Sequence, residues 1–212
     1  MNARFHETQH GETPIDEEDR EFLTPAYAHI TTRDELNLAE ATNIATGIQW
    51  LNRTGRLLSE SVLDQWFLRD LHRNMFGRVW TWAGRNRTRQ TNIGVDPALI
   101  TERWALLLDQ AHGWIEYDAY SPDEICVRLH HRLASIHPFV NGNGRHARLT
   151  ANKLAESLRL AEPGQSRYEW GFNASPSSRD AARRAYLDGL HAADQGDYAP
   201  LIDVALLPAT GV

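Results

Sequence analysis

The chain has 212 residues, of which 42% are hydrophobic and 24% are charged, a composition that argues against wholesale disorder. Its net charge of −6 at first sight disfavours an anionic ligand. Residues 1–24, however, hold seven acidic residues against two arginines and so account for −5 of that charge. No acidic residue occurs in residues 73–95 or 125–155, which together contain nine arginines and one lysine. An anionic ligand can therefore bind in these two stretches.

The composition also bears on location. The single cysteine, Cys126, cannot form an intrachain disulfide, and no apolar run approaches the ~18 residues of a membrane-spanning helix. The N-terminal residues are acidic and polar, unlike a secretory signal. We therefore expect a cytoplasmic protein that does not bind membranes.

The periodicity predicts an all-α fold, with an irregular acidic arm over residues 1–30 and a single domain over residues 31–212. Helix starts are marked by the capping-box pair Thr32 and Glu35 and by Ser121-Pro122, whereas Gly77 marks a helix end. The expected elements are, in chain order, helices over 32–51 and 59–76, a short hairpin or loop over 78–96, a helix after Pro97, helices over 121–136 and 145–160, a short strand over 168–172, and helices over 178–195 and 198–207.

The segment with the strongest chemical signal is residues 137–148. Glycines flank Asn143 directly before a predicted helix, so backbone N–H groups and the helix dipole can bind an anion there. Arg145 and Arg148 share one face of that helix, as a clamp on phosphate requires. His137 lies at the other end of the loop, and its near-neutral pKa suits a general base. A plain turn is the alternative, but this combination within twelve residues favours a phosphate site.

This segment resembles the signature of the Fic domain family, H-P-F-x-[D/E]-G-N-G-R-x-x-R, since it reads His137-Pro138-Phe139-x-Asn141-Gly142-Asn143-Gly144-Arg145-x-x-Arg148. The resemblance implies a helical bundle with a small β-hairpin flap and, in most members, transfer of AMP from ATP to a hydroxyl of a target protein. It implies that His137 deprotonates that hydroxyl and that Arg148 holds the γ-phosphate. The residues implied to cradle the phosphates are Gly142, Asn143, Gly144 and Arg145.

Asn141 departs from this signature, in which an Asp or Glu ligates the Mg²⁺ that bridges the phosphates of ATP. Asparagine offers one neutral amide oxygen, so we expect the metal to be held mainly by the nucleotide. Family members that depart from the motif can transfer phosphate or phosphocholine. The transferred group therefore stays open, and so does a degenerate module that binds nucleotide or a partner without catalysis.

Further segments resemble the Fic subfamily called mobile mystery protein B: Leu71-His72-x-x-Met75-Phe76, Val79-Trp80-x-Trp82-Ala83-Gly84, Thr91-Asn92-Ile93-Gly94 and His130-His131. In Fic proteins the region corresponding to residues 84–95 is a flap that aligns the backbone of the target, here with Thr91, Asn92, Ile93 and Gly94. A polar hairpin with solvated arginines is the alternative.

Two further predictions follow from the resemblance. Tyr186 and Asp194 lie in a C-terminal segment similar to the one that borders the nucleotide base. Many Fic proteins are inhibited by a glutamate that pairs with the second motif arginine, here Arg148, and Glu40 is the candidate. Glu35 is a second imperfect match, and either glutamate can instead be a solvated or capping residue.

Two other classes compete with this interpretation. The adjacent His130 and His131 diverge on a helix and have no nearby acid or cysteine to complete a ligand set, so we expect no protein-bound structural metal. Arginines interleaved with Trp80 and Trp82 are typical of a nucleic-acid stacking platform. The absence of a broad basic face makes that interpretation the weaker one. The target protein and the oligomeric state do not follow from the sequence.

Overall fold

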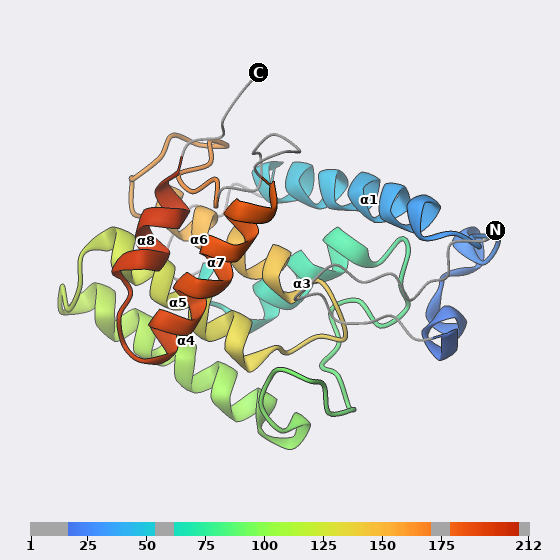
Figure 1. Cartoon of the computed structure of the whole chain (residues 1–212), viewed down its shortest axis with the longest axis horizontal. Coiled ribbons are helices and arrows are strands. Elements are labelled where there is room, and N and C mark those ends of the chain that lie inside the picture. The colour runs from blue at the N-terminus through green and yellow to red at the C-terminus, as the bar shows by residue number, and fades with distance from the viewer. Residues whose placement is uncertain (1–16, 54–61, 171–178, 208–212) are drawn as a thin grey trace.

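The computed structural model describes residues 17–53, 62–170 and 179–207, and within them the fold is helical. One isolated antiparallel bridge joins Leu23 to Trp80. The prediction of an all-α fold is therefore confirmed. The helices are, in chain order, η1 (Glu17–Phe22), η2 (Pro25–Tyr27), α1 (Arg33–Arg53), α3 (Gln65–Phe76), η3 (Pro97–Leu99), α4 (Ile100–Glu116), α5 (Pro122–Ile136), α6 (Asn143–Ser157), α7 (Arg179–Asp194) and α8 (Ala199–Leu206) (Figure 1).

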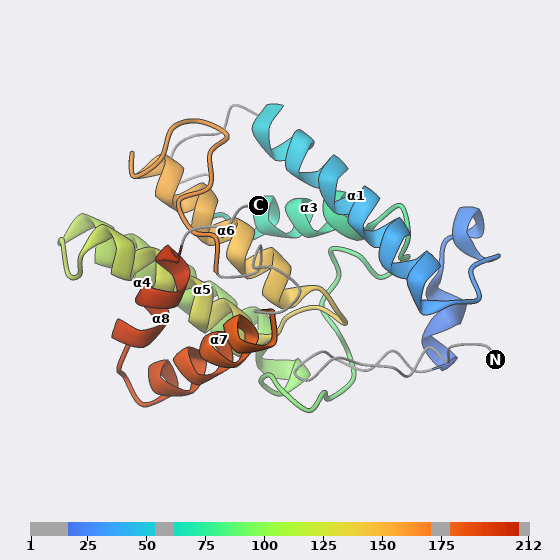
Figure 2. The same cartoon turned by 45° about the horizontal axis from the view of Figure 1, so that its top comes forward.

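Helices α5 and α6 run side by side through the middle of the molecule (Figure 2). Helix α5 also packs against α4 and α8, whereas α3 packs against α1, α4 and α6, and α7 packs against α8. The apolar positions predicted for α5, Ile125, Leu129, Leu133 and Ile136, are all buried. The polar connection between α5 and α6 is thereby fixed at both ends by the core.

Local capping explains where several helices begin. Ser121 accepts a hydrogen bond from the Glu124 amide at 3.3 Å, and Pro122 occupies the first position of α5, as predicted. Thr32 and Glu35 form the predicted capping box at the start of α1. Asp64 caps α3 through the amides of Trp66 and Phe67. Because Asp64 has an extended backbone, α3 starts at Gln65, whereas residues 59–61 of the helix expected over 59–76 lie outside the described residues.

The predicted β-hairpin flap is wrong, and of the two alternatives for residues 78–96, a hairpin or a loop, the structure has the loop. No strand is assigned in the described part of the chain, and residues 84–96 form an irregular loop. Its backbone groups bond to the α5–α6 connection instead of across a hairpin. The Arg87 amide donates to Pro138 O at 2.9 Å, and the Val95 amide donates to Ile136 O at 3.3 Å.

The strand expected over residues 168–172 is also wrong for its described part. Residues 168–170 are irregular, and Trp170 has a φ of 57°, which is incompatible with a strand. The Tyr168 backbone bonds to the side-chain amide of Asn152 at 2.8 Å and 3.0 Å. A side chain of α6 thus takes the place of a partner strand. Residues 171–172 lie outside the described residues.

Residues 20–30 lie against the core: the Thr24 amide donates to Val79 O at 2.9 Å, and Leu23 is buried. The predicted division into an arm and a single domain stays a prediction. None of the helices in the described ranges is long and apolar enough to cross a membrane.

Candidate active site

The connection between α5 and α6 begins at His137, which ends α5 in a left-handed conformation with φ 52° and ψ 61°. Few residues other than glycine adopt this conformation, and here it turns the chain sharply out of the helix. The His137 amide still donates to Leu133 O at 3.2 Å. The backbone of the candidate base is therefore fixed by the last turn of α5.

Asn143 closes the loop through its buried side-chain amide. Its Oδ1 accepts from the Phe139 amide and its Nδ2 donates to Phe139 O, both at 2.9 Å. Phe139 itself is fully buried. The Asn143 side chain thus shapes the phosphate cradle from within, and its backbone N–H is the part that can face an anion.

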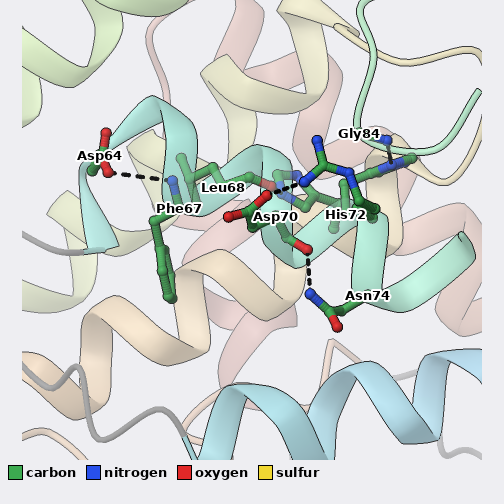
Figure 3. A network of polar contacts seen from close by, with 9 residues as sticks. Asp64, Phe67, Leu68, Asp70, His72, Asn74 and Gly84 are labelled. Atoms are coloured by element: carbon green, nitrogen blue, oxygen red, sulfur yellow. Dashed lines mark hydrogen bonds and ion pairs between the residues drawn. The ribbon is translucent and has the colours of Figure 1, made fainter.

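His72, on α3, supports the same loop through its ring nitrogens. The Gly84 amide donates to its Nδ1 at 3.0 Å (Figure 3). Its Nε2 donates to Asn141 O at 3.0 Å, and the two bonds together fix the neutral tautomer. Burial and the nearby His146 hold the pKa of His72 well below its usual range. Its ring stacks on Phe139 with centroids 3.6 Å apart. The sequence marked His72 only as part of a family segment, because its partners lie far along the chain.

The N-terminus of α6 is built to face a negative charge. Its N-cap is Gly142, with φ 79° and no side-chain hydrogen bond to the helix. A Cβ at Gly142 would come within 2.5 Å of the Phe76 ring, so both conformation and space require glycine. The first N–H groups of α6, including those of Asn143 and Gly144, have no acceptor within the helix. The helix dipole adds positive potential at the same point.

The two motif arginines occupy different surroundings on α6. Arg145 is partly exposed, and its Nη1 lies 2.8 Å from Glu40 Oε2. Arg148 is half-buried, lies over the Tyr186 ring at 5.6 Å and hydrogen-bonds to its hydroxyl. The expected pairing of Glu40 with Arg148 is therefore wrong, since Glu40 pairs with Arg145. The buried Glu40 can reach Arg145 because Trp80 Nε1 holds its other oxygen at 2.7 Å.

Burial, followed by the positive charge of Arg87, lowers the pKa of His137 to about 4. The Ala134 carbonyl, which accepts a hydrogen bond from the ring, opposes this shift. His137 is therefore neutral at physiological pH. A neutral imidazole has one N–H and one lone pair, and the bond to Ala134 leaves the lone pair on the other nitrogen. This is the protonation state that a general base requires.

Asn141 Oδ1 accepts the amide of Gly142 at 2.6 Å, and its carbonyl accepts His72 Nε2. The amide oxygen still has a second lone pair and can serve as one neutral metal ligand. Among the described residues, no group of three His, Cys, Asp or Glu side chains is placed to hold a metal ion. The residues at this loop thus fit a metal that is held chiefly by a bound triphosphate.

Among the predicted flap residues, Gly94 lies next to His137. A Cβ on Gly94 would be 2.7 Å from the His137 Cβ, so the two backbones are in close contact. Thr91 Oγ1 donates to Ile93 O, which tightens the turn, and Asn92 and Ile93 are exposed. The loop therefore brings the backbone of Gly94 beside the candidate base and exposes the preceding Asn92 and Ile93.

The two C-terminal candidates, Tyr186 and Asp194, have different hydrogen-bond partners. The Tyr186 hydroxyl lies 2.9 Å from His130 Nε2 and also bonds to Arg148, so Tyr186 belongs to the wall of the Arg148 site. Asp194 Oδ1 lies 2.8 Å from His131 Nε2, whose Nδ1 lies 3.1 Å from the Tyr198 hydroxyl. The Asp194 carboxylate is thus engaged in holding α7 to α5.

Residues 62–155 match the model of the Fic/DOC family. Among curated proteins, the chain is similar to protein adenylyltransferase fic-1 of Caenorhabditis briggsae, with 30% identity over 142 residues that cover 63% of this chain and 24% of the relative. It is also similar to protein adenylyltransferase Fic of Nematostella vectensis, with 26% identity over 167 residues that cover 77% of this chain and 36% of the relative.

The same fold occurs in solved structures. The crystal structure of the BepC protein, a VirB-translocated effector from Bartonella tribocorum with bound AMPPNP, has a TM-score of 0.63 at 16% identity. The match covers 90% of this chain and 97% of that one. The prediction of a Fic fold is therefore confirmed. By contrast, this chain spans only 24% and 36% of the length of the two curated relatives.

Proposed function

We propose that this chain transfers AMP from ATP to a hydroxyl of a target protein, with His137 as the general base. The observation that carries the proposal is the neutral, buried His137 at one end of a loop whose other end is an uncapped helix N-terminus followed by Arg145 and Arg148. The names of the curated relatives and the AMPPNP bound to BepC support it.

In this reaction the hydroxyl oxygen of the target attacks the α-phosphorus of ATP. Its proton passes to the lone pair of His137, the bond between the α-phosphorus and the bridging oxygen breaks, and pyrophosphate leaves. The first N–H groups of α6 and the guanidinium of Arg145 face the charge that develops on the phosphates. The half-buried Arg148 holds the far end of the triphosphate, and Tyr186 fixes its orientation. Bound Mg²⁺ would neutralise charge on the phosphates, with Asn141 as its single protein ligand.

The remaining assignments belong to the same proposal. Thr91 to Gly94 align the backbone of the target beside His137, which is consistent with the exposure of Asn92 and Ile93. Asp194 borders the nucleotide base from α7. The proposed location is the cytoplasm. The proposed subfamily is mobile mystery protein B, and this assignment rests on the sequence segments alone.

The neutral Asn141 favours a second candidate, a module that binds nucleotide or transfers another phosphate-containing group. The structure does not support the nucleic-acid interpretation, because Trp80 and Trp82 are only 1% and 8% exposed and cannot stack on bases. Their indoles instead stack on each other with centroids 5.1 Å apart.

The test is incubation with α-³²P- or γ-³²P-labelled ATP, Mg²⁺ or Mn²⁺, and a lysate. We expect protein label from the α position alone, and we expect His137→Ala to abolish it. His112→Ala, at an exposed histidine on α4, is the matched control and keeps the label. Label from γ alone would indicate phosphotransfer, whereas no label from either position would favour the binding module.

A further inference from the structure

Arg87 lies near the start of the loop over residues 84–96, yet it is only 3% exposed. Its guanidinium donates to three carbonyl oxygens: Nε to His137 O at 2.7 Å, Nη1 to Arg89 O at 2.9 Å, and Nη2 to Val95 O. Its own amide donates to Pro138 O at 2.9 Å. One residue therefore binds the backbone of the catalytic loop and both limbs of the flap loop.

The geometry of these bonds suits arginine. A guanidinium presents its N–H groups as a rigid planar fork, so three acceptors held by it are fixed relative to one another. A lysine carries its donors on one nitrogen and cannot span carbonyls on opposite sides of a loop. Burying this charge costs free energy, which the carbonyl dipoles and the charge of the nearby Asp96 partly offset.

The packing around Gly94 shows how closely the parts fit. A Cβ at Gly94 would be 2.6 Å from Arg87 Nη2 and 2.7 Å from His137 Cβ. The flap backbone, the guanidinium and the base thus touch at one point. A second link runs from the Val95 amide to Ile136 O, the carbonyl directly before His137.

We propose that Arg87 is a positioning residue that holds the flap backbone and His137 at a fixed separation, so that a target segment laid along the flap meets the base. This role rests on the proposed function, in which His137 receives the proton of the target hydroxyl. The guanidinium has a second effect, because its charge acts on the His137 ring while the Ala134 carbonyl acts in the opposite direction. Arg87 thereby supports both the place and the neutral state of the base.

The test compares Arg87→Gln, Arg87→Lys and, as matched control, Arg85→Gln, which removes the same charge from an exposed site two residues away. Hydrogen exchange at the Val95 amide reports on the flap, and an NMR titration of ¹³C-labelled histidines, assigned with His137→Ala, reports on the base. Neither measurement requires transfer activity. In Arg87→Gln we expect exchange at Val95 to speed up about tenfold or more and the pKa of His137 to rise by about half a unit or more.

Arg87→Lys separates the two effects. Because lysine retains the positive charge, the pKa of His137 stays close to that of the wild type. Because lysine cannot make the three bonds of the guanidinium to backbone carbonyls, exchange at the Val95 amide still speeds up. It also provides a second variant if Arg87→Gln does not fold. Where labelling is measurable, both variants lower kcat with little change in the KM for ATP, and Arg85→Gln behaves as the wild type.

Unchanged exchange at Val95 in both Arg87 variants would overturn the inference. The same is true if Arg85→Gln changes exchange and titration as much as Arg87→Gln. A wild-type chain that transfers no label contradicts the proposed function alone, since exchange and titration still measure whether Arg87 joins the flap to His137.

Discussion

At the scale of single residues, Asn143 shows how one side chain can hold a loop in place of regular structure. Replacing it with Ala leaves the amide and the carbonyl of the buried Phe139 without their partners. Because each unsatisfied buried group costs about 1–3 kcal/mol, losing both partners in Asn143→Ala should lower the free energy of unfolding by roughly 2–6 kcal/mol. Urea denaturation measures this change. The exposed Asn37→Ala on α1 is the control, and a similar loss in both variants would refute the clamp.

Glu40 occupies the site where a bound phosphate would compete for Arg145, since its carboxylate already holds that guanidinium at 2.8 Å. We propose that this pair inhibits transfer. Glu40→Gly should therefore raise auto-modification of the purified protein by releasing Arg145. The assay is α-³²P labelling without a lysate, and an unchanged signal would remove the hypothesis.

The matched control for Glu40 is Glu35→Gly in the same helix. Glu35 accepts the amides of Thr31 and Thr32 at 3.1 Å and 3.2 Å, so it caps α1. Its loss weakens the helix without releasing Arg145. An equal rise in labelling from Glu35→Gly would assign the effect to loosening of α1.

At the scale of helices, the cap of α3 affects the site because α3 carries His72 and the Phe76 ring that contacts Gly142. Asp64→Ala removes the acceptor for the amides of Trp66 and Phe67. We expect a loss of about 1 kcal/mol in the free energy of unfolding, measured by urea denaturation. Asp109→Ala, at an exposed position within α4, should change it by less than about 0.5 kcal/mol.

The helices that follow local rules were predictable from the sequence. Ser121 and Pro122 mark the start of α5, and its apolar stripe is buried as expected. The hairpin prediction failed because the acceptors for Arg87 and Val95 come from the α5–α6 connection, some 40 to 50 residues away. Local pattern reveals which backbone groups need partners but not which distant segment supplies them.

The same limit applies to the candidate site. The motif from His137 to Arg148 was recognisable because its residues are contiguous in the chain. The roles of His72 and Arg87 depend on contacts with carbonyl oxygens on other segments, which leave no periodic trace. The partner of Glu40 was assigned wrongly for this reason, since two arginines three residues apart differ only in their tertiary surroundings.

At the scale of the whole molecule, buried histidines make the fold sensitive to acid. Desolvation lowers the pKa of five described histidines: His72, His130, His131, His137 and His146. A histidine with a lowered folded-state pKa binds protons more readily in the unfolded chain. Its contribution to stability is full above about pH 6.5 and is lost as pH falls through the folded-state value.

The pKa of His137 and of His146 falls to about 4, so each should cost roughly 3 kcal/mol of stability by that pH. We therefore expect the urea midpoint, measured at constant ionic strength, to fall from pH 7 to pH 5 while the chain stays folded without urea. A variant at the exposed His112 should leave this pH dependence unchanged. The same urea midpoint at pH 7 and pH 5 would contradict the prediction.

The left-handed backbone of His137 means that the position of the base is costly for any residue with a Cβ. A non-glycine residue pays about 1 kcal/mol there, and alanine pays it without gaining the hydrogen bond to Ala134. His137→Gly should therefore be a more stable inactive protein than His137→Ala, and the better reagent for trapping an unreacted complex. At this one position, selection for catalysis and selection for folding favour different amino acids.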